Sequence, residues 1–149
     1  MTGGFLLDTS VVSATAPDRR TVPDVAKAAA RRWIVGNESR LYVPVIAITE
    51  IAAGIGAREV AGASRQAADL AAWLKAVIDA YPERLLVFDV EAALHARTLS
   101  RKVREAGIAV GFADLAVACI ARVHGLVVAT RNRRDFAPMG IDTVDPFVS

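Results

Sequence analysis

The chain has 149 residues, of which 54% are hydrophobic, and its 18 basic and 16 acidic residues give a formal net charge of +2. This length suits one domain around a single core. The most apolar stretches, residues 41–49 and 106–121, are shorter than the roughly 20 residues of a membrane-spanning helix, so we expect no membrane segment. The N-terminus lacks a basic region followed by an apolar one, and the single cysteine, Cys119, excludes an internal disulfide. We therefore expect a cytoplasmic protein in which Cys119 is a small buried hydrophobe.

Short apolar runs alternate with helical patterns along the chain. Strands are predicted at residues 5–7, 41–43, 85–88, 126–129 and 141–144, the last at a sheet edge. Helices are predicted at residues 9–14, 22–35, 44–54, 64–81, 90–106 and 111–124. This alternation indicates an α/β fold with a mainly parallel sheet of four or five strands, covered by helices on both faces. No repeat or linker interrupts it, so residues 1–149 are expected to form one domain.

Capping residues and apolar periodicity give these helices more detail. Ser64 is expected to cap one helix and Asp89 the next, which should run unbroken to Gly107. The helix over residues 44–54 is apolar nearly all round, which predicts burial. The helix over residues 22–35 is expected to bury one stripe of side chains: Val25, Ala29, Trp33 and Ile34.

Asp8 directly follows the apolar strand over residues 5–7. An ionised carboxylate there is costly unless something pairs with it, and ligands of parallel sheets bind beyond the carboxyl ends of the strands. The next two residues, Thr9 and Ser10, carry hydroxyls that can hold the carboxylate or cap the following helix. Two interpretations of Asp8 stay open, a helix cap and a member of a site to which other acids converge.

Three further acids are candidates for the same site. Glu50 is the one carboxylate of an apolar helix, and its alternative is a narrow solvent-exposed stripe shared with Arg58. Asp114 is the one polar side chain over residues 112–121 and lies inside the first helical turn, where free N–H groups and the helix dipole favour negative charge. Its alternative is a simple cap. Asp135 follows the fourth strand, and alone it would be interpreted as a surface residue.

Together the four acids indicate a metal site. In a parallel sheet all four can meet at one rim, and carboxylates brought together repel unless protons or cations intervene. Oxygen ligands without His or Cys select Mg²⁺ or Mn²⁺, and His95 and His124 lie in helices away from these acids. Such a cluster suits phosphoryl transfer, with one ion, or two about 3.5–4 Å apart, readying a water for in-line attack.

Basic residues gather in two segments of the chain. Arg131, Arg133 and Arg134 lie beside Asp135, where they can hold a phosphate backbone at the mouth of the same site. For the other cluster, on the helix over residues 90–106, a solvated face is the favoured interpretation: Arg97, Arg101, Lys102 and Arg104.

Four motifs, in this order, resemble the PIN-domain ribonucleases, and among them the VapC and FitB type of bacterial toxin. They are Leu-Leu-Asp-Thr-Ser at residues 6–10, Ile-Thr-Glu-Ile at 48–51, Gly-Phe-Ala-Asp-Leu-Ala-Val-Ala at 111–118 and Ala-Thr-Arg-Asn-Arg-Arg-Asp-Phe at 129–136. The closing Val-Asp-Pro-Phe at residues 144–147 is also similar to the usual ending of that group. The resemblance spans the whole chain.

The resemblance implies a PIN-like three-layer sandwich and an endoribonuclease that uses Mg²⁺ or Mn²⁺ to cut tRNA, rRNA or mRNA. It implies a homodimer, held inactive by a small antitoxin that carries a DNA-binding domain, and higher hetero-oligomers with that partner. By motif, the metal ligands would be Asp8, Glu50 and Asp114. Supporting polar positions would be Thr9, Ser10 and Thr130.

One position departs from the family pattern, and two other functions stay open. Many members carry an acid directly after Thr-Arg, where this chain has Asn132, and Asp135 three residues later is the candidate to take its role. A metal-dependent phosphatase would use Asp8 as nucleophile, but the haloacid dehalogenase-type pattern wants a second Asp where Ser10 stands. A non-catalytic subunit that only dimerises and binds a DNA-binding partner would not need the set of acids.

Overall fold

The computed structural model describes residues 3–18 and 22–148. Five parallel strands form one sheet in the order β3-β2-β1-β4-β5: β1 (Phe5–Leu7), β2 (Leu41–Pro44), β3 (Leu85–Leu86), β4 (Val127–Ala129) and β5 (Thr143–Val144). The helices are α1 (Thr9–Ser13), α2 (Val25–Gly36), α3 (Val45–Val60), α4 (Ser64–Ala80), α5 (Val90–Leu94), α6 (Ala96–Glu105), α7 (Phe112–His124) and α8 (Arg133–Phe136). Two short 3₁₀ turns, η1 (Glu38–Arg40) and η2 (Ala137–Met139), complete the elements.

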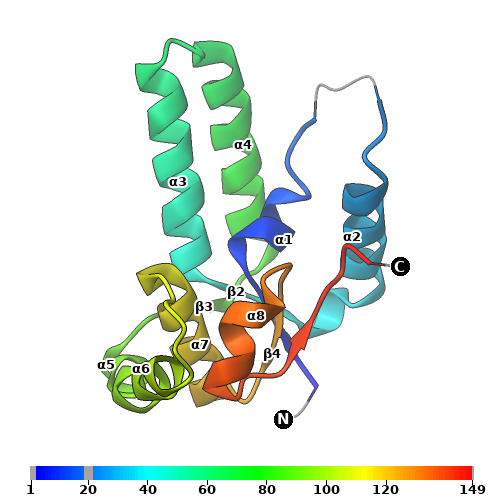
Figure 1. Cartoon of the computed structure of the whole chain (residues 1–149). Helices are drawn as coiled ribbons and strands as arrows, with labels where there is room; N and C mark the ends of the chain where they lie inside the picture. The colour runs from blue at the N-terminus through cyan, green and yellow to red at the C-terminus, as the bar shows by residue number, and fades with distance from the viewer. Residues whose placement is uncertain (1–2, 19–21, 149) are drawn as a thin grey trace.

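Two hydrophobic cores lie on opposite faces of the sheet. Successive side chains of a strand point to opposite faces, so Leu7 packs with α1 to α4 and Leu6 packs with α5 to α7. Figure 1 shows the resulting layers, with α2 on one side of the strands and α5 and α6 on the other. The predicted α/β fold with a parallel sheet flanked on both faces is confirmed. Cys119 is buried as expected, on α7.

Helices α3 and α4 pair as a hairpin that rises from the body of the molecule (Figure 1). Only Ala47, Ile51 and Ile55 of α3 are buried, because this helix packs on α1 and α4 along one side and meets solvent elsewhere. The prediction that residues 44–54 are buried all round was therefore wrong. Apart from Val60 at its end, the exposed positions of α3 carry polar side chains or alanines, which expose little apolar area: Thr49, Glu50, Ala52, Ala53, Ala57, Arg58 and Glu59.

Several helix boundaries differ from the predicted ones. Helix α2 begins at Val25, because the Asp24 carboxylate caps it by accepting from the Lys27 N–H at 3.0 Å. The Val25 side chain is exposed and does not join the buried stripe. The first residue of α4 is Ser64, and its predicted cap is absent because Ala63 holds that position.

The helix predicted over residues 90–106 is divided into α5 and α6 at His95, whose N–H bonds three residues back to the Ala92 carbonyl. Asp89 caps α5 as expected, accepting from the Ala92 N–H at 2.9 Å. Among residues 3–18 and 22–148, no helix is both long and apolar enough to cross a membrane.

Candidate functional site

The register of the two central strands brings Asp8 and Thr130 together. Leu7 of β1 pairs with Ala129 of β4, so the residues that follow them emerge side by side at the carboxyl edge of the sheet. Asp8 is only 5% exposed, and both its carboxylate oxygens are occupied. One accepts from the N–H of Ser10 at 2.9 Å and from its hydroxyl at 2.6 Å, and the other accepts from the Thr130 hydroxyl. Asp8 is therefore the cap of α1 and also half of a buried pair.

Thr130 is fully buried, and its hydroxyl has a fixed direction. The Thr130 oxygen accepts from the Asn132 N–H at 2.9 Å, so its own proton is directed to Asp8. The carbonyl of Asn132 accepts from the Asp135 N–H at 3.1 Å, which curls residues 132–135 into the start of α8. Asn132 thus participates through its backbone, while its side chain is exposed and makes no capping bond.

Glu50 reaches the same edge from α3. The hydroxyl of Thr9, the first residue of α1, donates to the Glu50 carboxylate and so links the two helices. The alternative of a stripe shared by Glu50 and Arg58 stays open, because both side chains are exposed and line one groove. The Arg58 guanidinium also bonds the Gly54 carbonyl at 3.2 Å. Glu50 is exposed, in contrast to the buried Asp8.

Asp114 completes the cluster from the first turn of α7. Burial, a hydrogen bond to the Asp135 carboxyl and the charge of Asp135 raise the pKa of Asp114 from 3.8 to about 7, with smaller contributions from Asp8 and Glu50. The same interactions show that Asp8, Glu50 and Asp135 lie within electrostatic reach of Asp114, although they come from the end of β1, from α3 and from α8. A hydrogen bond between two carboxyl groups requires a proton on one of them, and the raised pKa supplies it near neutral pH.

The chemistry of this cluster fits a hard divalent cation. All four groups are carboxylates, and hard oxygen donors favour Mg²⁺ and Mn²⁺. Among the described residues, no three acidic, His or Cys side chains converge closely enough to make a preformed metal site. Carboxylates brought together repel one another, and a cation held among them would relieve that repulsion.

Two of the three arginines beside Asp135 are engaged within the chain. The Arg131 guanidinium lies 3.8 Å from the centre of the Phe147 ring, and Arg133 donates through Nε to the Thr143 hydroxyl at 3.1 Å. Arg134 is exposed. The partner of Arg131, Phe147, belongs to the closing Val-Asp-Pro-Phe motif, and phosphate binding by the three arginines stays a prediction.

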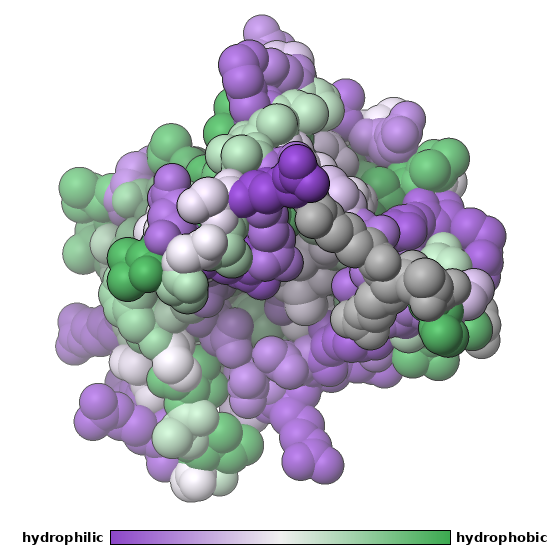
Figure 2. Space-filling view, turned by 90° about the horizontal axis from the view of Figure 1, so that it is seen from above, coloured by the Kyte–Doolittle hydropathy of each residue, from purple (hydrophilic) through white to green (hydrophobic). Residues whose placement is uncertain are grey.

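A groove of about 650 Å³, which no sequence pattern predicted, runs from the acidic cluster between α1, α3 and α4. Thr9 and Glu50 lie at its border with the cluster. Its other lining residues include apolar and charged groups: Ile51, Ile55, Leu70 and Trp73, with Asp18, Lys27, Arg58 and Asp69. Seen from above, hydrophilic residues lie near the middle of the molecule and also along its margins, where they alternate with hydrophobic ones (Figure 2).

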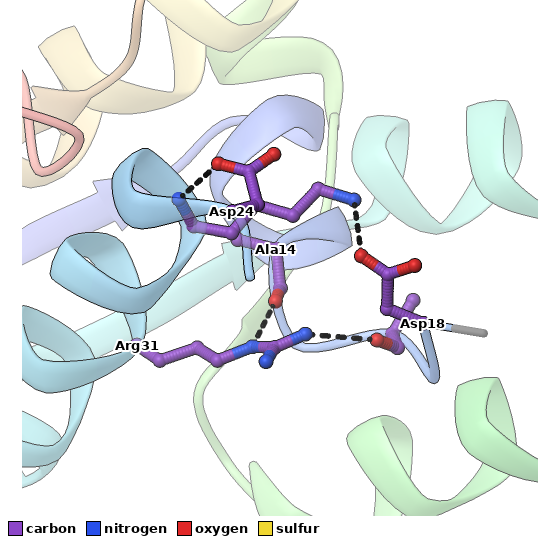
Figure 3. Close-up of polar contacts among 6 residues, drawn as sticks. Ala14, Asp18, Asp24 and Arg31 are labelled. Atoms are coloured by element: carbon purple, nitrogen blue, oxygen red, sulfur yellow. Dashed lines mark hydrogen bonds and ion pairs between the residues drawn. The ribbon is translucent and has the colours of Figure 1, made fainter. Parts of the chain in front are cut away.

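Polar contacts hold the segment after α1 along this groove. Figure 3 shows that Arg31 of α2 reaches back to this segment, bonding the Ala14 carbonyl at 2.6 Å and the Ala16 carbonyl at 3.3 Å. The ammonium group of Lys27 lies 3.6 Å from the Asp18 carboxylate. The Trp73 indole of α4 donates to the Thr15 hydroxyl at 3.1 Å. The wall of the groove is thus tied to α2 on one side and to α4 on the other.

Fold and site together define an α/β protein with a carboxylate cluster at the carboxyl edge of a parallel sheet. The sequence model of the PIN domain family matches residues 5–140, so the chain belongs to this family. It is 33% identical to the plasmid stability protein StbB of Pseudomonas syringae pv. tomato, over 96% of this chain and 98% of that protein. It is 30% identical to the VapC ribonuclease Y4jK of Sinorhizobium fredii, over 96% and 97%.

Solved structures show the same fold. FitAcB from Neisseria gonorrhoeae superposes with a TM-score of 0.81 at 22% identity, covering 97% of this chain and 99% of that one. DNA-bound VapBC from Salmonella typhimurium superposes with a TM-score of 0.67 at 26% identity, again over 97% and 99%. The family resemblance drawn from the four motifs is confirmed.

Proposed function

We propose that this chain is a cytoplasmic endoribonuclease that depends on Mg²⁺ or Mn²⁺ and acts as the toxin of a toxin–antitoxin pair. The observation that carries the proposal is the position of Asp114, bonded to Asp135 and within the field of Asp8 and Glu50. The fold itself does not need so many negative charges in one place. The names of two relatives, VapC ribonuclease and plasmid stability protein, support this function.

In this proposal Asp8, Glu50 and Asp114 hold the cation. A cation held there would supply activation of a water for attack on an RNA phosphodiester and neutralisation of charge on the leaving oxygen. The chain's own residues hold these ligands in place. Ser10 and Thr130 fix both oxygens of Asp8, and Thr9 fixes Glu50 on the neighbouring helix. All three arginines of the cluster are exposed, and we assign the RNA phosphate to Arg134 because Arg131 stacks on Phe147 and Arg133 bonds Thr143.

A phosphatase that uses Asp8 as its nucleophile is less favoured, because the haloacid dehalogenase-type pattern wants a second Asp where Ser10 stands. The Asp8 oxygen that accepts from Thr130 keeps a second lone pair, which can serve a cation. The non-catalytic alternative is separated from the proposal by the cleavage experiment below.

We place the antitoxin in the groove between α1, α3 and α4. The carboxylates at its border favour an inserted basic side chain, which would compete with the cation. Its wall of Ile51, Leu70 and Trp73 favours apolar neighbours in the same segment. Solved relatives include VapBC and FitAB bound to DNA, which supports an antitoxin with a DNA-binding domain and a larger hetero-oligomer.

The proposed homodimer has a candidate surface in the segment before Asp114. Several side chains there are apolar and exposed: Val87 after β3, Val90 and Leu94 on α5, Ile108 between α6 and α7, and Phe112 at the start of α7. Phe112 packs edge-on against Phe88 at 6.0 Å between ring centres, which continues the surface toward β3. Grouped exposed apolar residues of this kind are typical of surfaces covered by another chain.

Expression of the chain alone tests the proposed function. We expect arrested bacterial growth and cleavage of cellular RNA, both relieved when the neighbouring antitoxin is co-expressed. The purified chain should cut RNA in Mg²⁺ or Mn²⁺ and lose this activity in excess chelator. Folded, soluble protein that is harmless in cells and leaves RNA intact with either ion would favour the non-catalytic alternative.

A prediction for Asp135 separates it from its neighbour Asn132. Because Asp135 bonds Asp114, Asp135→Asn should lower the apparent Mg²⁺ affinity by about 10–100-fold, as loss of groups that orient metal ligands does. Asn132→Ala keeps the backbone bonds to Thr130 and Asp135, so it should cleave like the wild type. Cleavage rates measured across a Mg²⁺ titration give both values. An unchanged titration for Asp135→Asn would remove Asp135 from the site.

A further inference from the structure

The segment that carries Thr130 and Asp135 is held from outside by the last strand and the residues after it. Residues 143–147, here called the C-terminal brace, begin with β5 and continue through Pro146 to Phe147, which are both buried. The carboxylate of Asp145 accepts from the Phe147 N–H at 2.9 Å and fixes the turn in which the ring lies. Phe147 itself belongs to the core that includes Leu7, directly before Asp8.

Three contacts connect the brace to residues 130–133. The Thr130 N–H donates to the Val144 carbonyl at 2.9 Å, and Arg133 donates to Thr143. Between them, the Arg131 guanidinium covers the Phe147 ring at 3.8 Å, well within the distance of a favourable cation–π contact. In the chain, Arg131 stands between the buried Thr130 and Asn132. The backbone N–H of Asn132 donates to the Thr130 hydroxyl.

This arrangement gives Arg131 influence over a bond that it does not make. A rotation of the backbone at Arg131 would move the Asn132 N–H away from the Thr130 oxygen. The Thr130 hydroxyl would then be free to turn away from Asp8, which would lose the donor to one of its two oxygens. The flat guanidinium on the ring opposes that rotation, because stacking needs both the charge and the planar shape.

We propose that Arg131 and Phe147 form a positioning pair that fixes the direction of the Thr130 hydroxyl, and through it the carboxylate of Asp8. This inference rests on the proposed ribonuclease function for its kinetic consequences, but not for its structural ones. It assigns to Arg131 a role different from binding the RNA backbone. The two roles predict different kinetics, because a phosphate contact affects binding of RNA whereas a misdirected Asp8 affects the chemical step.

The kinetic experiment compares Arg131→Lys and Phe147→Leu with two reference variants. Arg131→Lys keeps the charge but not the planar group, and Phe147→Leu keeps apolar volume but not the ring. Both should lower kcat about 10–100-fold, as small misplacements at a reactive centre do, with KM and its salt dependence unchanged. Phe147→Tyr, which keeps the aromatic ring, should have the kcat of the wild type. For comparison, Arg134→Ala should raise KM and weaken its salt dependence, and Arg97→Lys on α6 controls for the exchange of an exposed arginine.

Amide hydrogen exchange on the metal-free protein gives a second readout that does not need activity. Arg131→Lys and Phe147→Leu should speed exchange at the Asn132 amide at least about tenfold, while amides of α7 stay protected and show that the chain is folded. Phe147→Tyr should exchange like the wild type. If the wild type proves unable to cut RNA, the proposed function fails and exchange alone decides on the positioning pair.

Three results would overturn the positioning role. The first is wild-type exchange at Asn132 in Arg131→Lys. The second is a raised KM with unchanged kcat in that variant, which would assign Arg131 to RNA binding. The third, in a chain that does cut RNA, is faster exchange with unchanged kcat, because Thr130 would then be loosened without consequence for Asp8.

Discussion

Asp114→Asn is expected to reduce RNA cleavage at least about 100-fold, the loss typical of removing one charge-stabilising group from an active site. The substitution is conservative for the fold, because an Asn amide can still donate to the Asp135 carboxylate that Asp114 contacts. It removes one negative charge from the set that would hold the cation. Cleavage of a labelled RNA in Mg²⁺, with circular dichroism as a check of folding, measures the effect.

Asp8→Asn should be equally inactive but less stable. An Asn amide nitrogen at this buried position would meet the donors of Ser10 or Thr130, and a buried donor without an acceptor costs about 1–3 kcal/mol. Glu59→Gln, an exposed acid on α3, serves as the control that removes a charge away from the cluster. Cleavage that persists in chelator, or at wild-type rate in Asp114→Asn, contradicts the metal site.

In chelator, the same Asp114→Asn substitution is expected to make the protein more stable at alkaline pH. The folded metal-free chain keeps a proton on Asp114 up to about pH 7, whereas the unfolded chain releases it near the ordinary pKa of 3.8. The folded state therefore binds more protons in this window. Its free energy of unfolding is highest below the window and falls as the pH rises through it.

The variant has no such proton to lose, so its excess stability over the wild type should grow between pH 5 and pH 8. The first pH lies inside the window, about one unit above its lower limit, and the second about one unit above its upper limit. Asp114 is only half-buried, and solvent screening reduces the difference to about 1 kcal/mol, or about 2–4 °C in Tm for a domain of this size. Thermal unfolding in chelator at both pH values measures it. Added Mn²⁺ should stabilise the wild type more than the variant. Equal Tm values for the two proteins at both pH values would show that Asp114 is not under electrostatic strain.

The sequence predicted the sheet and its helices because their signals are local. Alternating strands and helices, glycines such as Gly107 and Gly125 with positive φ, and the cap at Asp89 each depend on a few neighbouring residues. The errors arose where packing decides. The exposure of Val25 and of most of α3 depends on how far each helix projects from the core, which periodicity alone does not contain.

The candidate site divides in the same way. Asp8, Glu50 and Asp114 stood out because each is an acid in an apolar stretch. The contact of Thr130 with Asp8 follows from the pairing of β1 with β4, and the stacking of Arg131 on Phe147 follows from the path of the chain after β5. Neither contact can be predicted from the local pattern of residues. The groove beside the cluster needs three packed helices before it exists.

The pairing of β1 with β4 also sets the order of events during synthesis. The bond between Thr130 and Asp8 joins residues 122 positions apart, and contacts of such long range close late in folding. When a ribosome has made α1 to α7, the attached chain contains Asp8, Glu50 and Asp114 but not yet the strand that aligns them. The nascent chain therefore lacks the assembled cluster while its own message is still being translated, and the cluster forms only after β4 and α8 have emerged.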